Sequence, residues 1–83
     1  MDKIIVEVFF PSLQRAFDIE IPVNTRFHVI AELIEQSVSS ISGGEYTPSG
    51  EALLCDRISG AVFDINSSPD KQCLYNGSKL MII

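Results

Sequence analysis

The hydrophobic pattern of this chain changes its period once, and that change constrains the fold more than any other feature. Apolar residues occupy every second position of 3–10 and of 17–21, which is the period of a strand with one buried face. From residue 27 onward they recur at spacings of three and four, the period of an amphipathic helix. The helical stripe comprises Phe27, Ile30, Ile34, Val38 and Ile41, with Leu33 widening it. The pattern therefore predicts two strands followed by a helix that covers one face of the sheet.

Local signals predict where these elements begin and end. Residues 11–14 supply the turn between the two strands, and Pro22 ends the second strand because it has no backbone N–H to donate. Asn24 or Thr25 is then in position to cap a helix that begins near Arg26. The polar side of that helix is expected to carry Arg26, Glu32, Glu35 and Gln36.

The second half of the chain alternates short apolar runs with turn signals. Residues 42–50 are rich in Ser and Gly and predict a surface loop. Strands are expected over 52–55 and 61–65, followed by an irregular turn or short helical stretch. The Asn76-Gly77 pair is a strong turn signal because both residues tolerate positive φ, and it leads into a last strand over 78–83.

Length and charge narrow the classes of function. The chain of 83 residues has room for one domain, covering 1–83. Eleven acidic against six basic residues give a formal net charge of −5, the wrong sign for a protein that neutralises phosphates, so we expect no nucleic-acid partner. No apolar run approaches the roughly 20 residues that cross a bilayer. We therefore expect a cytoplasmic protein without membrane insertion.

The residues that most often carry catalysis are few and scattered. His28 is the single histidine, and Glu32 four residues later is interpreted as an ordinary neighbour on the helix surface. Two cysteines cannot hold an iron–sulfur cluster, and a zinc site would need further ligands. Cys55 is interpreted as a small buried residue, and a disulfide to Cys73 is left open. We expect neither an enzyme nor a bound cofactor or metal.

The predicted order of elements resembles that of ubiquitin over nearly the whole chain. Leu53-Leu54-Cys55 is similar to its third strand, and Leu74 to Leu80 is similar to the approach to its last strand. The start at Lys3, the Leu53–Asp56 run and the Asn-Gly-Ser-Lys-Leu ending resemble more specifically the bacterial YukD/EsaB-like ubiquitin-fold proteins, which accompany type VII (WXG100) secretion systems in Gram-positive bacteria. The resemblance implies an α+β, β-grasp (ubiquitin-like) fold, in which a mixed sheet of four to five strands packs on one amphipathic helix.

The resemblance to ubiquitin does not extend to its reactive end. Conjugation and sulfur-carrier chemistry use a flexible tail that ends in Gly-Gly, whereas this sequence ends at Ile83 within the last predicted strand. We therefore expect a ubiquitin-like protein that is not conjugated to others. The family resemblance implies a protein partner drawn from the secretion system.

The predicted strand phases leave four apolar side chains on the outer face of the sheet. These residues are Ile5, Leu54, Met81 and Ile83, and Leu54 and Ile83 match positions of the hydrophobic patch in ubiquitin. Clustered apolar side chains mark protein-binding sites, although scattered ones are normal on any surface. The predicted function is a non-conjugated protein-binding adaptor or regulator of type VII secretion. The alternative is a structural domain that forms a homo-oligomer or a fixed subunit of a larger complex, and the open sheet edges offer strand addition as a second route to either.

Overall fold

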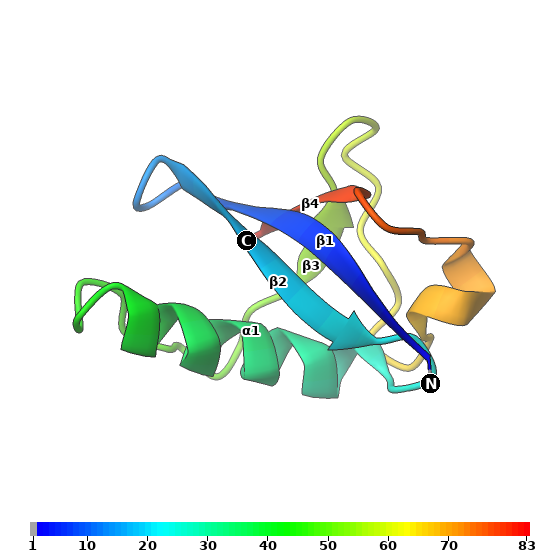
Figure 1. The fold of residues 1–83 in the computed structure, drawn as a ribbon, viewed down its shortest axis with the longest axis horizontal. Coiled ribbons are helices and arrows are strands. Elements are labelled where there is room, and N and C mark those ends of the chain that lie inside the picture. The colour runs from blue at the N-terminus through cyan, green and yellow to red at the C-terminus, as the bar shows by residue number, and fades with distance from the viewer. Residues whose placement is uncertain (1) are drawn as a thin grey trace.

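One long helix packs against one face of a four-stranded sheet (Figure 1). The computed structural model describes residues 2–83. Its elements in chain order are the strands β1 (Lys3–Phe10) and β2 (Arg15–Pro22), the helix α1 (Phe27–Ile41), the strand β3 (Leu54–Asp56), the 3-10 helix η1 (Pro69–Gln72) and the strand β4 (Lys79–Ile82). This architecture confirms the predicted α+β class and the mixed sheet.

The strands lie in the order β2-β1-β4-β3. The hairpin pair β1–β2 and the pair β3–β4 are antiparallel, whereas β1 and β4 run parallel. The N-terminal and C-terminal strands are therefore neighbours at the centre of the sheet, and β2 and β3 form its two edges. Val8 of β1 lies between Phe17 of β2 and Leu80 of β4 in this register.

The strand predicted over 61–65 is reduced to a single bridge between Val62 and Cys55. Backbone hydrogen bonds on either side of this bridge still join the segment to β3, from Asp56 N–H to Ala61 O at 2.9 Å and from Phe63 N–H to Leu54 O at 2.9 Å. Immediately afterwards the chain turns away, because the Asp64 side chain accepts the N–H of Asn66 at 2.8 Å. The prediction of a full strand was wrong, but the segment covers the outer edge of β3.

The core lies between α1 and the inner face of the sheet. Its buried side chains come from alternate positions of the strands and from one stripe of the helix, as the hydrophobic periods predicted. They are Val6, Val8, Phe10, Ile19, Ile21, Phe27, Ile30, Ala31, Ile34, Val38, Leu54, Leu80 and Ile82. Leu74, in the segment before the last strand, packs against this cluster while partly exposed.

The buried stripe of α1 differs from the prediction on both sides. Leu33 is 48% exposed and Ile41 is also exposed, so the prediction that they join the core was wrong. Glu35, expected on the polar side, is instead only 1% exposed. The buried face of the helix is thus turned toward Ala31 and Glu35, because the loop after α1 packs on that side, whereas on the other side β2 is the last strand that residues 2–83 contribute to the sheet.

Backbone carbonyls, rather than a side chain, satisfy the first amides of α1. Arg26 occupies the N-cap position and makes no side-chain capping bond. The N–H of Phe27 donates to Ser67 O at 2.8 Å, and the N–H of His28 donates to Ile65 O at 3.1 Å. The predicted cap by Asn24 or Thr25 was therefore wrong, since a distant segment supplies the acceptors.

The Asn76-Gly77 turn joins the entry to β4 with the start of β1. Gly77 has φ of +93°, a conformation that glycine adopts without strain. The Asn76 side chain accepts the N–H of Ile5 at 2.8 Å, and the N–H of Gly77 donates to Ile5 O at 2.8 Å. The predicted turn is confirmed, and it fixes the parallel pairing of β1 with β4.

Candidate protein-binding surface

Three of the four predicted surface residues lie on the outer face of the sheet, away from α1. Ile5 on β1 is 51% exposed, and Ile83, which directly follows β4, is 55% exposed. Met81 on β4 is half-buried. Each alternates with core residues on its own strand, as the period of two requires.

Leu54 is the exception, because its side chain is in the core. It is 2% exposed, pairs with Ile82 of β4 and packs in the hydrophobic cluster. The outward position of β3 belongs to Cys55, which lies opposite Met81 and is itself buried beneath the segment bridged by Val62. The predicted phase was wrong because the apolar run 52–55 does not alternate, so pairing with β4 decides which side chain points inward.

An ion cluster separates Ile5 from the other outer residues. The Glu7 carboxylate lies 2.8 Å from Lys79 Nζ and 3.7 Å from the Arg57 guanidinium. The hydrogen bond and charge of Lys79 lower the pKa of Glu7. In the register of β1 with β4, Glu7 pairs with Lys79 and the next outward pair is Phe9 with Met81. The predicted four-residue patch is therefore not one surface.

The continuous apolar surface on this face is smaller and includes a residue that the prediction left out. We define the outer patch as Phe9, Met81 and Ile83. The Arg57 guanidinium lies 4.3 Å from the centre of the Phe9 ring and so borders the patch with a cation. Phe9 lies on the outer face because it alternates with the buried Val8 and Phe10 of β1. No sequence signal indicated its contact with Arg57, which comes from the turn after β3.

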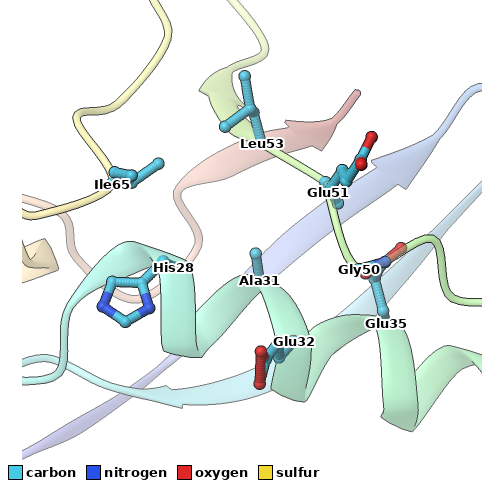
Figure 2. Close-up of a pocket in the computed structure, with 9 residues that line it drawn as sticks. His28, Ala31, Glu32, Glu35, Gly50, Glu51, Leu53 and Ile65 are labelled. Carbon is cyan, nitrogen blue, oxygen red and sulfur yellow. Dashed lines mark hydrogen bonds between the residues drawn. The ribbon is translucent and has the colours of Figure 1, made fainter.

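A second concave region lies between α1 and the stretch that precedes β3. Figure 2 shows this groove, which has a volume of about 250 Å³, with α1 on one side and the 50–53 stretch on the other. Its lining residues are His28, Ala31, Glu32, Glu35, Gly50, Glu51, Ala52, Leu53 and Ile65.

The floor of this groove is held by the buried carboxylate of Glu35. It accepts hydrogen bonds from the Tyr46 hydroxyl at 2.5 Å, from the Ser49 N–H at 3.0 Å and from the Gly50 N–H at 3.4 Å. Burial by itself would raise the pKa of Glu35, but these hydrogen bonds outweigh it and lower the pKa below its ordinary value. Burial and the nearby carboxylate raise the pKa of Tyr46. Glu35 thus fastens the loop after α1 to the helix.

The remaining candidate chemistry does not converge on a site. No ion pair or hydrogen bond joins His28 to Glu32 within the described residues. Cys55 and Cys73 are free thiols, and burial raises the pKa of the Cys55 thiol. Residues 2–83 contain no group of three or more His, Cys, Asp or Glu side chains arranged to hold a metal ion. Neither helix in this range has both the length and the apolar sequence that crossing a bilayer requires.

Solved structures show the same fold in other proteins. No protein-family model and no curated protein sequence matches the chain. The ubiquitin-like domain of the type VII secretion protein EccD1 from Mycobacterium tuberculosis superposes with a TM-score of 0.77 at 16% sequence identity, over 100% of this chain and 99% of that domain.

Two further matches are chains within larger assemblies. A chain of a MycP5-free ESX-5 inner membrane complex matches with a TM-score of 0.72 at 17% identity, over 100% of this chain but 21% of its own length. A chain in the structure of a toluene 4-monooxygenase HD complex matches with a TM-score of 0.76 at 12% identity, covering 98% of this chain and 96% of that chain. At these identities the likeness concerns the fold alone. The chain has a ubiquitin-like, β-grasp fold, as the sequence predicted.

Proposed function

We propose that this chain is a single ubiquitin-like domain that binds another protein non-covalently, as an adaptor or regulator of a type VII secretion system. The observation that carries the proposal is the end-to-end match to the ubiquitin-like domain of EccD1, over 100% of one chain and 99% of the other. The sequence resemblance to YukD/EsaB-like proteins supports the same class of role. In this proposal the domain acts in the cytoplasm and its partner is a component of the secretion system.

The partner contacts the outer patch of Phe9, Met81 and Ile83. Phe9 and Met81 lie on the two central strands, whose inward neighbours Val8 and Leu80 are fully buried. A patch on such a rigid support loses little conformational entropy when a partner binds. Arg57 beside Phe9 adds a cation at its margin. Ile5 lies beyond the ion cluster of Glu7 and would contact only a partner large enough to span it.

The test is crosslinking in cells from a photoreactive residue at position 79, beside the patch. We expect capture of a secretion ATPase or membrane component of the secretion system, with strong loss of capture in Met81→Glu and in Ile83→Asp. Met81→Leu keeps an apolar side chain of similar volume and serves as the matched control. A second crosslinker at position 32, on α1, should not capture the same protein.

Two results would overturn this assignment. One is unchanged capture by Met81→Glu and Ile83→Asp proteins that retain the circular dichroism of the native fold. The other is equal capture from positions 79 and 32, because the outer patch would then not be the surface in contact.

The second candidate is a structural role, in which the outer patch closes a homodimer or holds the domain as a fixed subunit. Two of the structurally similar chains occur within larger protein complexes, and this supports a structural role as the second candidate. Sedimentation velocity separates the two functions. A dimer that persists below about 1 μM and is broken by Met81→Glu would establish assembly, whereas a monomer at that concentration supports transient binding.

A further inference from the structure

The two edges of the sheet differ in what covers them. The outer edge of β3 is hydrogen-bonded to Ala61 and Phe63. At the other end of the sheet, β2 pairs with β1 alone among the strands within residues 2–83. This eight-residue strand is therefore an edge onto which another strand can add.

The hydrogen bonds of β1 show which groups of β2 point outward. The N–H of Glu7 donates to Ser78 O and the C=O of Ile5 accepts from Gly77 N–H, so the odd-numbered residues of β1 face β4. Even-numbered residues of β1 must face β2, where their partners are residues 15, 17, 19 and 21. The backbone groups of Ala16, Asp18 and Glu20 consequently point away from the sheet.

Pro22 fits this assignment of the outward groups. It occupies the fourth outward position of β2, opposite Lys3. A proline there removes no hydrogen bond between β1 and β2, because the missing N–H would have pointed into solvent. Three donors and their accompanying acceptors thus remain along the edge before the proline ends it.

An apolar flank of α1 lies beside this edge. The groove residues Ala31 and Glu35 mark the flank nearest β3, and at 100° per residue Leu33 falls on the other side of the buried stripe. Ile41 has the angle of the stripe itself but is exposed as the last residue of α1. Figure 1 shows that α1 and β2 approach each other where β2 ends and α1 begins, and the two elements are in contact. We call Leu33 and Ile41 the open flank. A strand added to β2 would pack its inward side chains on these two residues.

The negative charge on the outer face of β2 favours a particular kind of added strand. Asp18 and Glu20 are exposed, and neither takes part in a salt bridge or a side-chain hydrogen bond within residues 2–83. Outward side chains of an added strand would lie opposite them, so basic residues are favoured. Pairing of β2 with β2 of a second copy would instead bring these carboxylates together, which disfavours the homodimer.

We propose that the edge of β2 binds an extended peptide segment of alternating basic and apolar residues, by strand addition. The apolar side chains pack on the open flank, and the basic ones face Asp18 and Glu20. This site is separate from the outer patch and stands whether or not the type VII assignment is correct.

The probe is a labelled eight-residue peptide in which lysine and valine alternate, with both ends blocked. Fluorescence anisotropy gives its affinity, and amide shifts in nitrogen-15 spectra locate it. We expect shifts and slowed hydrogen exchange at Ala16, Asp18 and Glu20, with smaller shifts at Leu33. A peptide with glutamate in place of lysine should bind at least about tenfold more weakly, since like charges then face each other.

Two sets of variants test the backbone and the charge separately. Ala16→Pro removes one outward N–H and leaves the β1 ladder intact, so the lysine peptide should bind about tenfold more weakly. Asp18→Lys with Glu20→Lys should reverse the preference between the two peptides. Glu32→Lys with Glu51→Lys makes the same change in net charge on the groove side, and should alter affinity by no more than about twofold.

Several outcomes would overturn the proposal. They are absence of binding, shifts centred on β4, equal affinity for the two peptides, and an Ala16→Pro protein that keeps its thermal stability and binds normally. Concentration-dependent dimerisation with slowed exchange at Ala16 to Glu20 would assign the edge to a second copy and would also refute it.

Discussion

The two flanks of α1 belong to one helix, yet one is covered and the other is bare. On the groove side, the buried Glu35 carboxylate accepts hydrogen bonds from the 46–50 loop. On the open flank, Leu33 and Ile41 are exposed although they follow the apolar spacing of the core. A carboxylate is buried here because polar partners reach it, and two apolar residues are exposed because nothing in the sheet extends over them. Partners, rather than hydropathy, decide what is covered.

The largest expected effect comes from removing the buried carboxylate. Glu35→Ala leaves the amides of Ser49 and Gly50 without their acceptor and opens a cavity, so we expect unfolding to become easier by about 3 kcal/mol. Urea denaturation followed by circular dichroism measures the change. Glu32→Ala, on the exposed surface three residues earlier, should change stability by less than about 0.5 kcal/mol. Equal effects of the two substitutions would abolish the contrast between buried and exposed carboxylates.

The contribution of Glu35 to stability should depend on pH, because its carboxylate charge accepts the loop's hydrogen bonds. Its pKa in the folded state is depressed below the ordinary 4.5, so its charge stabilises the fold above the unfolded pKa. That contribution should be lost as pH falls through the folded pKa. The stability advantage of the native protein over Glu35→Gln should therefore be full at pH 7 and should shrink steadily below about pH 4.5. An advantage that stays constant down to pH 3 would show that the charge of Glu35 is not what holds the loop.

Removing only one of the donors should have a smaller effect. Tyr46→Phe keeps the edge-to-face ring contact with Phe10, whose centroid lies 4.9 Å away, but deletes the hydroxyl bonded to Glu35. We expect a loss of about 1.5 kcal/mol, typical of a hydrogen bond to a charged acceptor. Combining it with Glu35→Ala, which removes the acceptor, in a double-mutant cycle measures their coupling. Strict additivity of the two losses would contradict the bond between them.

The smallest effect is expected on the open flank. Leu33→Lys should change the unfolding free energy by no more than about 0.5 kcal/mol, because the side chain is already 48% exposed. Thermal denaturation compares it with Ile34→Ala at the next residue, which should cost about 3 kcal/mol since Ile34 is fully buried. A large loss in Leu33→Lys would mean that the open flank is covered in solution.

The candidate site was only partly predictable, and the errors have identifiable physical causes. Leu54 was assigned to the wrong face because an apolar run without alternation carries no phase of its own. Ile5 was grouped with Met81 because its phase is correct, but the ion pair of Glu7 with Lys79, residues far apart in the chain, lies between them. Phe9 was left out because the sequence does not show that Met81 and Arg57, which are distant in the chain, lie beside it.

Hydrophobic periodicity in the sequence was enough to predict the hairpin and the helix, and the residue types of Asn76-Gly77 predicted the turn before the last strand. The order of these elements resembled that of ubiquitin. These features depend on residues a few positions apart, whose spacing records which side is buried. Tertiary structure decided the inward position of Leu54, the burial of Glu35 and the exposure of Leu33. Each of those depends on whether a segment distant in the chain packs against the side chain or hydrogen-bonds to it. The local hydrophobic pattern carries no information about such distant contacts.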